Sequence, residues 1–269
     1  MIERIHSKIS REIRKRYRRG VPLQDETTFR ERGTNWYEPN LAGPATFAER
    51  CSSAETVSGV MGILKMLTAD KFIDFTLEYY QAGLDRFRAR WKYADILTVL
   101  LAICQSIKVE SYLEIGVRRG RSMAVVAATH PRAELVGFDA WIADYVGIEN
   151  PGPEFVQEEL KKVGYAGTVE LISGDSRRTV PQYFRRHPNA FFDLITVDGD
   201  HSAGGARIDV LNVIPRLKVG GFLVFDDIRN PYHPRLRKVW ERYLQRSRRF
   251  MTATFEELGY GVGFAIKRY

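Results

Sequence analysis

The sequence predicts an α/β fold in which an N-terminal helical cap precedes a doubly wound, mostly parallel sheet. From residue 109 onward, short apolar runs alternate with helical patterns, which is the order of strand–helix units in a parallel sheet. Before that point the apolar pattern is helical or absent. After residue 249 two apolar runs flank a Gly-containing turn, which predicts an antiparallel hairpin added to one sheet edge.

Residues 1–107 are expected to form the cap, part helical and part irregular. Five apolar residues at helical spacing predict a first helix: Ile2, Ile5, Ile9, Ile13 and Tyr17. Residues 20–55 lack periodicity and contain several Pro and Gly residues, which predicts a long irregular segment. Further helices are predicted over residues 57–67, 72–87 and 93–107.

Residues 108–269 are expected to form the sheet domain. Its parallel strands are predicted at residues 111–115, 134–138, 168–173, 192–197 and 221–225. The helices between and after them are predicted at residues 121–129, 154–163, 177–184, 205–216 and 234–248. The C-terminal hairpin is predicted at residues 250–255 and 264–267.

Composition allows one large core and a small cap, since 44% of the 269 residues are hydrophobic. The net charge of +8 is unevenly placed: residues 1–19 and 234–249 each carry +6, so the remainder is mildly acidic. Basic helices bind nucleic acid, anionic lipid or acidic partners. A solvated face or a subunit contact explains them equally well, and we expect a homo-oligomer formed through the N-terminal helix.

The two cysteines, Cys51 and Cys104, form no CxxC pair, which argues against a disulfide scaffold and a zinc ribbon. The basic N-terminus is not followed by the apolar run of a signal peptide. The most apolar stretch, residues 94–107, is too short to span a bilayer. The protein is therefore expected to be soluble and cytoplasmic, without a membrane span.

Acidic side chains follow two neighbouring strands of the predicted sheet. Asp198, Asp200 and His201 come directly after one strand, and Asp226 and Asp227 end the next. Chemistry in open α/β sheets lies beyond the carboxyl ends of the strands, so these groups are expected to share one divalent-cation site. Successive residues of a strand point to opposite faces. Asp226 and Asp227 can therefore share an ion only if the backbone turns between them.

The first strand–helix turn contains Glu114, Gly116 and Gly120 at a GxxxG spacing, which differs from the dinucleotide fingerprint. Its two glycines let the backbone approach a ligand closely. A carboxylate beside the turn favours a ligand with an ammonium or sulfonium group, and S-adenosylmethionine (SAM) carries both. Asp139, 23 residues after Gly116, is placed to bind ribose hydroxyls. Asp175 ends the third strand near the expected adenine, although any one of these acids could instead cap a helix.

Five motifs together carry a family resemblance: LEIGVRRGRS at residues 113–122, GFDAW at 137–141, SGDS at 173–176, VDGDHS at 197–202 and FDD at 225–227. With them the chain resembles class I SAM-dependent methyltransferases. Within that class it is most similar to bacterial metal-dependent O-methyltransferases of the macrocin and noviose type, with cephalosporin-hydroxylase-like proteins as cousins. The resemblance implies a Rossmann-like fold and makes residues 108–269 a SAM-binding methyltransferase domain.

The resemblance also implies roles for individual residues. Glu114, Gly116 and Gly120 would lie at the methionine part of SAM, with Ser122 at its carboxylate. Asp139 would bind the ribose, and Asp175 with Ser176 the adenine. The metal ligands would be Asp198, Asp226 and Asp227. Asp200 would be the general base, with His201 as the second choice.

The expected reaction is methyl transfer from SAM to a hydroxyl of a sugar or other small hydroxylated metabolite, assisted by Mg²⁺ or Mn²⁺. Hard oxygen ligands suit these cations, and a bound cation stabilises an alkoxide by Lewis acidity. One alternative is a nucleic-acid methyltransferase, which is disfavoured because the acidic site lacks a base-stacking motif. A second is a non-methylating member of the fold, such as a hydroxylase-like protein.

Overall fold

The computed structural model describes residues 28–31, 34–37, 43–145 and 147–268. The helix predicted near the N-terminus, and the oligomer expected to form through it, lie outside the described residues. Among the helices that the structure describes, none combines the length and the apolar character needed to span a membrane.

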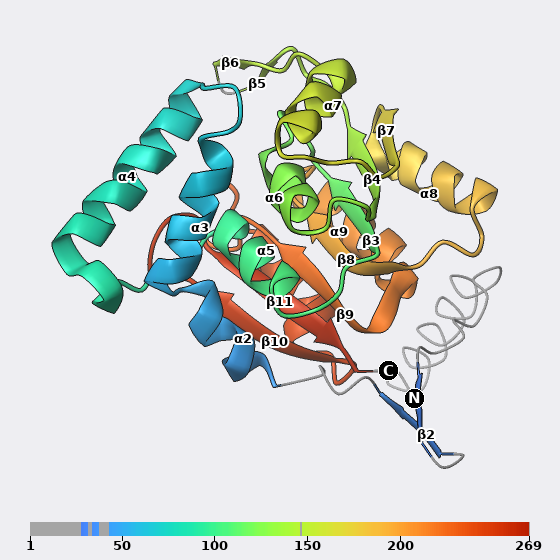
Figure 1. Ribbon diagram of the computed structural model, residues 1–269. Coiled ribbons are helices and arrows are strands. Elements are labelled where there is room, and N and C mark those ends of the chain that lie inside the picture. Colours follow the sequence, from blue (N-terminus) through green and yellow to red (C-terminus); the bar gives the residue numbers. More distant parts are fainter. Residues whose placement is uncertain (1–27, 32–33, 38–42, 146, 269) are drawn as a thin grey trace.

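A seven-stranded sheet forms the centre of the molecule, in the order β7-β4-β3-β8-β9-β11-β10 (Figure 1). Its five parallel strands are β3 (Ser111–Ile115), β4 (Glu134–Asp139), β7 (Val169–Ser173), β8 (Phe192–Val197) and β9 (Leu217–Phe225). The last two strands, β10 (Phe250–Phe255) and β11 (Val262–Lys267), run antiparallel and join the sheet beside β9. The predicted doubly wound, mostly parallel sheet with a C-terminal hairpin is thereby confirmed.

Helices cover both faces of the sheet (Figure 1). One side carries α2 (Pro44–Cys51), α3 (Ala54–Leu64), α4 (Lys71–Phe87), α5 (Ile96–Cys104), α6 (Arg121–Thr129) and α7 (Pro153–Lys162). The other side carries α8 (Ser176–Arg186), α9 (Ala203–Val213) and α10 (Leu236–Trp240). Short elements complete the described chain: η1 (Arg88–Arg90), η2 (Ile214–Arg216), the π-helical turn η3 (Glu241–Gln245), and two small hairpins, β1 (Thr28–Glu31) with β2 (Thr34–Tyr37) and β5 (Asp144–Tyr145) with β6 (Ile148–Glu149).

Two hydrophobic cores lie on opposite faces of the sheet. Successive strand residues point to opposite sides, so Tyr112 of β3 enters the core under α5 and α6, whereas Leu113 enters the core under α8 and α9. The cap helices α3 and α5 belong to the first of these cores. Because the cap and the sheet share this apolar core, the cap holds a fixed place beside the sheet.

The segment predicted to be irregular, residues 20–55, is helical over its last part, so that prediction was wrong for α2. Gly43 precedes the helix, and Pro44 occupies its first turn, where a missing N–H costs nothing. Phe47 and Cys51 lie one turn apart and are both buried. The glycine–proline pair, interpreted as a loop signal, instead starts a short helix.

The predicted helix over residues 234–248 is also shorter than expected. It is regular only in α10 and continues as the π-helical turn η3, with Trp240 buried at the junction. Strand β9 begins four residues before its predicted start, and a register shift opposite Phe192 and Leu194 accommodates the additional length. Both differences lie away from the carboxyl ends of the parallel strands.

Candidate active site

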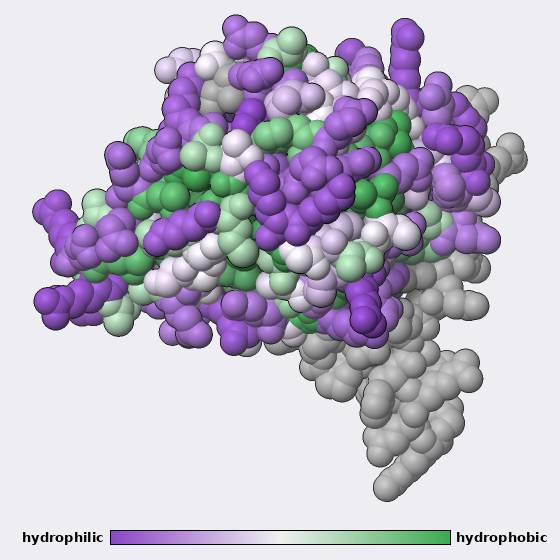
Figure 2. Space-filling view, turned by 45° about the horizontal axis from the view of Figure 1, so that its top comes forward, coloured by the Kyte–Doolittle hydropathy of each residue, from purple (hydrophilic) through white to green (hydrophobic). Residues whose placement is uncertain are grey.

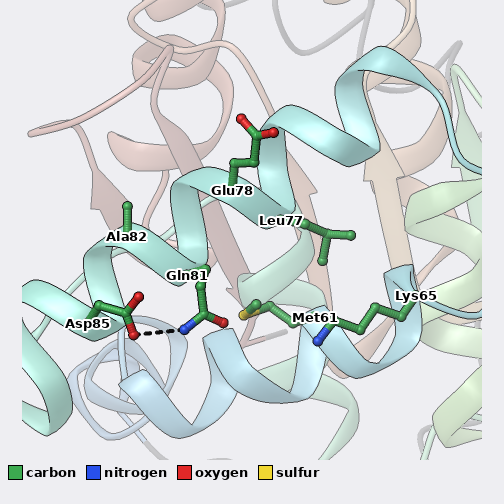
Figure 3. Close-up of a pocket in the computed structure, with 7 residues that line it drawn as sticks. All are labelled: Met61, Lys65, Leu77, Glu78, Gln81, Ala82 and Asp85. Carbon is green, nitrogen blue, oxygen red and sulfur yellow. Dashed lines mark hydrogen bonds between the residues drawn. The ribbon is translucent and has the colours of Figure 1, made fainter.

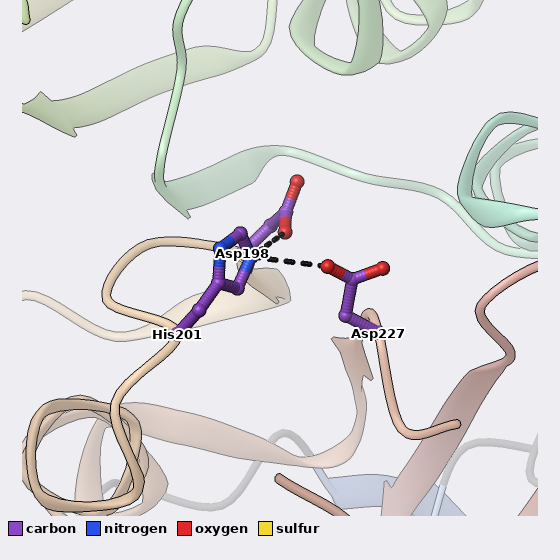
Figure 4. A group of neighbouring side chains, drawn as sticks. All are labelled: Asp198, His201 and Asp227. Atoms are coloured by element: carbon purple, nitrogen blue, oxygen red, sulfur yellow. Dashed lines mark hydrogen bonds and ion pairs between the residues drawn. The ribbon is translucent and has the colours of Figure 1, made fainter. Parts of the chain in front are cut away.

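Three side chains meet at the carboxyl edge of the parallel strands: Asp198 after β8, His201 in the turn that follows, and Asp227 after β9 (Figure 4). One ligand atom from each lies within 4.8 Å of the other two. His201 Nε2 is 3.3 Å from Asp198 Oδ1 and 3.2 Å from Asp227 Oδ2. Carboxylate oxygens with one ring nitrogen form a donor set that suits a divalent cation.

The backbone turns after β9, at Asp227. Such a turn is what Asp226 and Asp227 would need in order to share an ion. Asp227 has φ +63°, a left-handed conformation uncommon outside glycine. Asn230 Nδ2 donates to Asp227 Oδ2 at 2.9 Å and so fixes the carboxylate. The turn aims Asp227 at Asp198 and His201, and Asp226 is not one of these three grouped ligands.

Asp226 nevertheless lies in the same electrostatic environment. Burial raises its pKa well above the ordinary value, and the charges of Asp198 and Asp227 raise it further. The pKa of Asp227 is raised by burial first and then by Asp198. Carboxylates that raise one another's pKa form a site that a cation stabilises. Two of the three predicted metal ligands, Asp198 and Asp227, therefore converge, and their charges act on the third, Asp226.

The two predicted bases have different surroundings. Asp200 Oδ1 accepts the Ser202 backbone N–H at 2.7 Å, and the carboxylate packs so closely on Gly205 that a Cβ there would lie 1.8 Å from Oδ2. Asp200 thus faces the start of α9. His201 faces the two carboxylates, and its hydrogen bond to Asp198 is the main cause of its raised pKa.

The loop between β3 and α6, residues 116–120, is called the first loop. Its backbone contacts the strand end that carries Asp198. Gly116 has φ +96°, and a Cβ on it would lie 2.0 Å from the Asp198 carbonyl oxygen. Gly120 has φ +75° and begins α6, where a Cβ would lie 2.9 Å from Val156. Only glycine fits either position without rearrangement. The loop that is expected to hold the methyl donor is therefore in direct contact with the strand end that carries Asp198.

Glu114 is completely buried under this loop. Ser122 Oγ donates to its Oε1, whereas its Oε2 has no hydrogen-bond partner among the described residues. Burial raises the pKa of Glu114 to about 8, and the charges of Asp198 and Asp139 add to that rise. An unsatisfied buried carboxylate oxygen suits a ligand with a positive group or a hydrogen-bond donor.

The other predicted cofactor residues lie at the ends of β4 and β7. Asp139 accepts backbone N–H bonds from Arg118 at 2.7 Å and Trp141 at 2.6 Å, and so ties the first loop to the loop after β4. Asp175 caps α8 through the Arg177 N–H at 2.9 Å and also forms an ion pair with the Arg177 side chain. Ser176 begins α8 next to Asp175. Burial raises the pKa of the nearby acid Asp209 to about 6.

Sequence reasoning missed several groups around this site. His233 stacks on His201 with ring centroids 5.1 Å apart, and Asp209, fully buried on α9, faces Asp200. From the cap, Tyr93 lies close enough that Asp226 adds to a rise in its pKa caused mainly by burial and Asp95. Only His233, six residues after Asp227, had a local signal, because it follows the acidic pair in the same turn.

A comparison with protein families identifies this part of the chain. Residues 113–228 match the family model described as a methyltransferase domain. These residues form a methyltransferase domain. The match begins within β3 and ends after Asp227, so it contains Glu114, the first loop and the three grouped ligands. No curated protein matches the sequence.

Solved structures of methyltransferases share the fold of this chain over about three-quarters of its length. The O-methyltransferase TomG from Streptomyces achromogenes, solved with SAM, is 18% identical, with a TM-score of 0.53 over 76% of this chain and 92% of TomG. An O-methyltransferase from Bacillus cereus is 15% identical, with a TM-score of 0.53 over 75% and 92% of the two chains. CalS11, a TDP-rhamnose 3′-O-methyltransferase, is 18% identical, with a TM-score of 0.50 over 79% and 93%. The inferred resemblance to class I SAM-dependent methyltransferases is confirmed.

A separate groove of about 470 Å³ lies between α3 and α4 (Figure 3). Its lining residues are Met61, Lys65, Leu77, Glu78, Gln81, Ala82 and Asp85. On the α4 side of the groove, the Gln81 side-chain amide donates a hydrogen bond to Asp85 Oδ1 at 2.8 Å. In Figure 2 apolar residues are scattered over this face of the molecule among hydrophilic groups. The lining of the groove contains none of the candidate-site residues named above.

The buried carboxyl of Glu114 predicts a pH-dependent stability. Its folded pKa of about 8 exceeds the unfolded value near 4.5, so the folded state binds the proton more tightly. The free energy of unfolding of the ligand-free protein should therefore fall as pH rises from about 4.5 to about 8. Glu114→Gln should show a smaller fall between pH 6 and pH 8, measured by urea unfolding. Glu110→Gln, at an exposed position, is the control, and identical slopes in both variants would contradict the assignment.

Proposed function

We propose that this protein is a SAM-dependent O-methyltransferase that uses a divalent cation to methylate a hydroxyl of a sugar or another small hydroxylated metabolite. The observation that carries the proposal is the contact between Gly116 of the first loop and the Asp198 backbone. It holds the expected donor loop beside the three grouped ligands Asp198, His201 and Asp227. A methyl donor and an activated hydroxyl need this proximity, because alignment supplies much of the rate enhancement.

The residues present fit SAM. Glu114 offers a buried carboxylate oxygen without a partner, which a positive methionine-side group would satisfy. Asp139 stands at the end of β4 with its carboxylate held by two backbone N–H groups, an orientation suited to accepting ribose hydroxyls. We retain Gly116, Gly120 and Ser122 for the methionine part, and Asp175 with Ser176 for the adenine.

The residues present also fit a divalent cation. Asp198, Asp227 and His201 would hold it, and its positive charge would lower the raised pKa of the neighbouring Asp226. The cation would supply Lewis acidity that favours the alkoxide form of the acceptor. The imidazole among oxygen ligands makes Mn²⁺ as good a candidate as Mg²⁺.

Asp200 is retained as the proposed proton acceptor, and among the described residues its Oδ1 accepts the Ser202 N–H while its Oδ2 packs on Gly205. His201 is the second choice, because its Nε2 atom already lies between two carboxylates. A hydroxylated acceptor would approach from the cap, where Tyr93 lies near Asp226. The similarity in fold to CalS11, which acts on TDP-rhamnose, supports a sugar as the acceptor class.

The proposal is tested by incubating the protein with methyl-labelled SAM and a panel of nucleotide sugars, glycosides and catechols. We expect label in one acceptor class with Mg²⁺ or Mn²⁺, and loss of transfer with a chelator that is reversed by added metal. Binding of S-adenosylhomocysteine without transfer to any hydroxyl would contradict methyl transfer. Transfer that is insensitive to the chelator would contradict the metal role.

A further inference from the structure

A cluster of cations lies where the first loop meets the start of α4. Arg118, Arg121 and Lys71 place their charged groups 5.0, 5.5 and 5.7 Å from the Phe72 ring centroid. Arg119 is next to them, with its guanidinium 4.4 Å from the Phe155 ring. Lys71 from the cap and three arginines from the methyltransferase domain thus form one cluster of cations, called the arginine cluster. The candidate active site next to it is acidic.

The acid nearest to the arginine cluster is fully engaged. Asp70 Oδ1 accepts the backbone N–H groups of Phe72 and Ile73 at 2.9 Å and so caps α4. Its Oδ2 is 2.8 Å from Arg119 Nε, and both side chains are about nine-tenths buried. Asp70 therefore neutralises Arg119 and is unavailable as a close partner for Arg121.

Within the described part of the chain, Arg121 forms neither an ion pair nor a side-chain hydrogen bond, and its guanidinium rests on the Phe72 ring. It is half-buried at the first position of α6. Burial lowers its pKa, and the charges of Arg118 and Arg119 lower it further, whereas Asp70 and Asp198 act in the opposite direction. A partly desolvated cation repelled by two others is stabilised by a bound anion.

We propose that Arg121 binds an anionic group of the methyl acceptor, a phosphate or a carboxylate, while the hydroxyl to be methylated lies at Asp198 and Asp227. This inference rests on the proposed function and narrows its substrate class to acidic metabolites. Arg121 begins α6 five residues after Gly116, which is in contact with the Asp198 backbone, so Arg121 and Asp198 lie at the same strand–helix turn. A guanidinium presents planar, paired donors that match carboxylate and phosphate oxygens.

The test compares Arg121→Gln with Arg121→Lys and with Arg86→Gln. Arg86 is the matched control, because its guanidinium also lies over a ring, 5.3 Å from Phe87, at the opposite end of α4. Affinities for thymidine diphosphate and for glucuronate would be measured by calorimetry on protein saturated with S-adenosylhomocysteine. These two probes distinguish a phosphate-bearing from a carboxylate-bearing acceptor.

For Arg121→Gln we expect the affinity for one probe to fall about tenfold or more, because the substitution removes a charge-assisted contact. The loss should be smaller for Arg121→Lys and absent for Arg86→Gln, with affinity for S-adenosylhomocysteine unchanged in all three. Failure of the wild-type protein to bind either probe, or equal binding by Arg121→Gln, would overturn the inference. Weaker binding of S-adenosylhomocysteine with unchanged binding of methylthioadenosine would also overturn it, because the donor's own carboxylate would then be the ligand.

These outcomes separate this inference from the proposed function. If the wild-type protein transfers methyl groups in a chelator-sensitive way but Arg121→Gln binds both anions normally, only the anionic acceptor is excluded. If no methyl transfer occurs with any hydroxylated acceptor, the proposed function fails whatever Arg121 binds.

Discussion

Asp198→Asn should lower kcat/KM for methyl transfer by roughly 10²–10³-fold, because it removes a charged group from the centre of the three grouped ligands. The side chain keeps its shape, so the contact of the Asp198 backbone with Gly116 is retained. Affinity for S-adenosylhomocysteine should therefore stay within about threefold of the wild-type value, a small change in free energy. Steady-state kinetics with varied metal and calorimetry of the donor product measure the two effects separately.

Asp85→Asn is the matched control for this substitution, since it removes one carboxylate from the groove between α3 and α4. It should leave both quantities unchanged. If Asp198→Asn retained wild-type turnover and wild-type dependence on metal, Asp198 would have no role in metal binding.

Gly116→Ala should lower the free energy of unfolding by about 3 kcal/mol and abolish binding of the donor product. Two penalties combine: a left-handed backbone for a residue with a side chain, and a Cβ placed 2.0 Å from a carbonyl oxygen that belongs to a packed strand end. The midpoint of urea unfolding should fall with little change in its slope.

Gly62→Ala is the matched control, and we expect it to change the free energy of unfolding in the opposite direction. Gly62 lies within α3, no atom lies within 4 Å of the place that a Cβ would take there, and its φ is not left-handed. Alanine should raise the free energy of unfolding by up to about 1 kcal/mol, because it favours the helix. Equal effects of the two substitutions would show that the close contact of Gly116 with Asp198 is not real.

Four of the five parallel strands, β3, β4, β8 and β9, were predictable from the sequence because each is a short run that is mostly buried. The runs ending at Ile115 and Val197 have the bounds that the structure gives to β3 and β8. Helix α2 was not predictable in the same way. It is eight residues long with only Phe47 and Cys51 buried, and two apolar positions are too few to define a helical period.

The placement of the candidate site followed from topology alone, since acids after adjacent parallel strands must share one edge of the sheet. Topology alone did not predict which side chains come together there. That grouping depends on the left-handed turn at Asp227 and on the direction of the His201 ring, which no spacing in the sequence specifies. Tyr93 of the cap lies near Asp226, although the two residues are over a hundred positions apart in the sequence. A single sequence carries no signal for such a contact.

The central claim is that strand-end carboxylates hold a cation next to the methyl donor. The most direct test is anomalous diffraction from crystals grown with Mn²⁺ and S-adenosylhomocysteine. We predict one strong manganese peak within about 2.0–2.4 Å of oxygen atoms of Asp198 and Asp227, a typical distance for oxygen ligands of a divalent cation. The donor product should lie against Gly116 with its sulfur facing the metal. Ordered donor product with no manganese at Asp198, or manganese bound elsewhere, would contradict the claim.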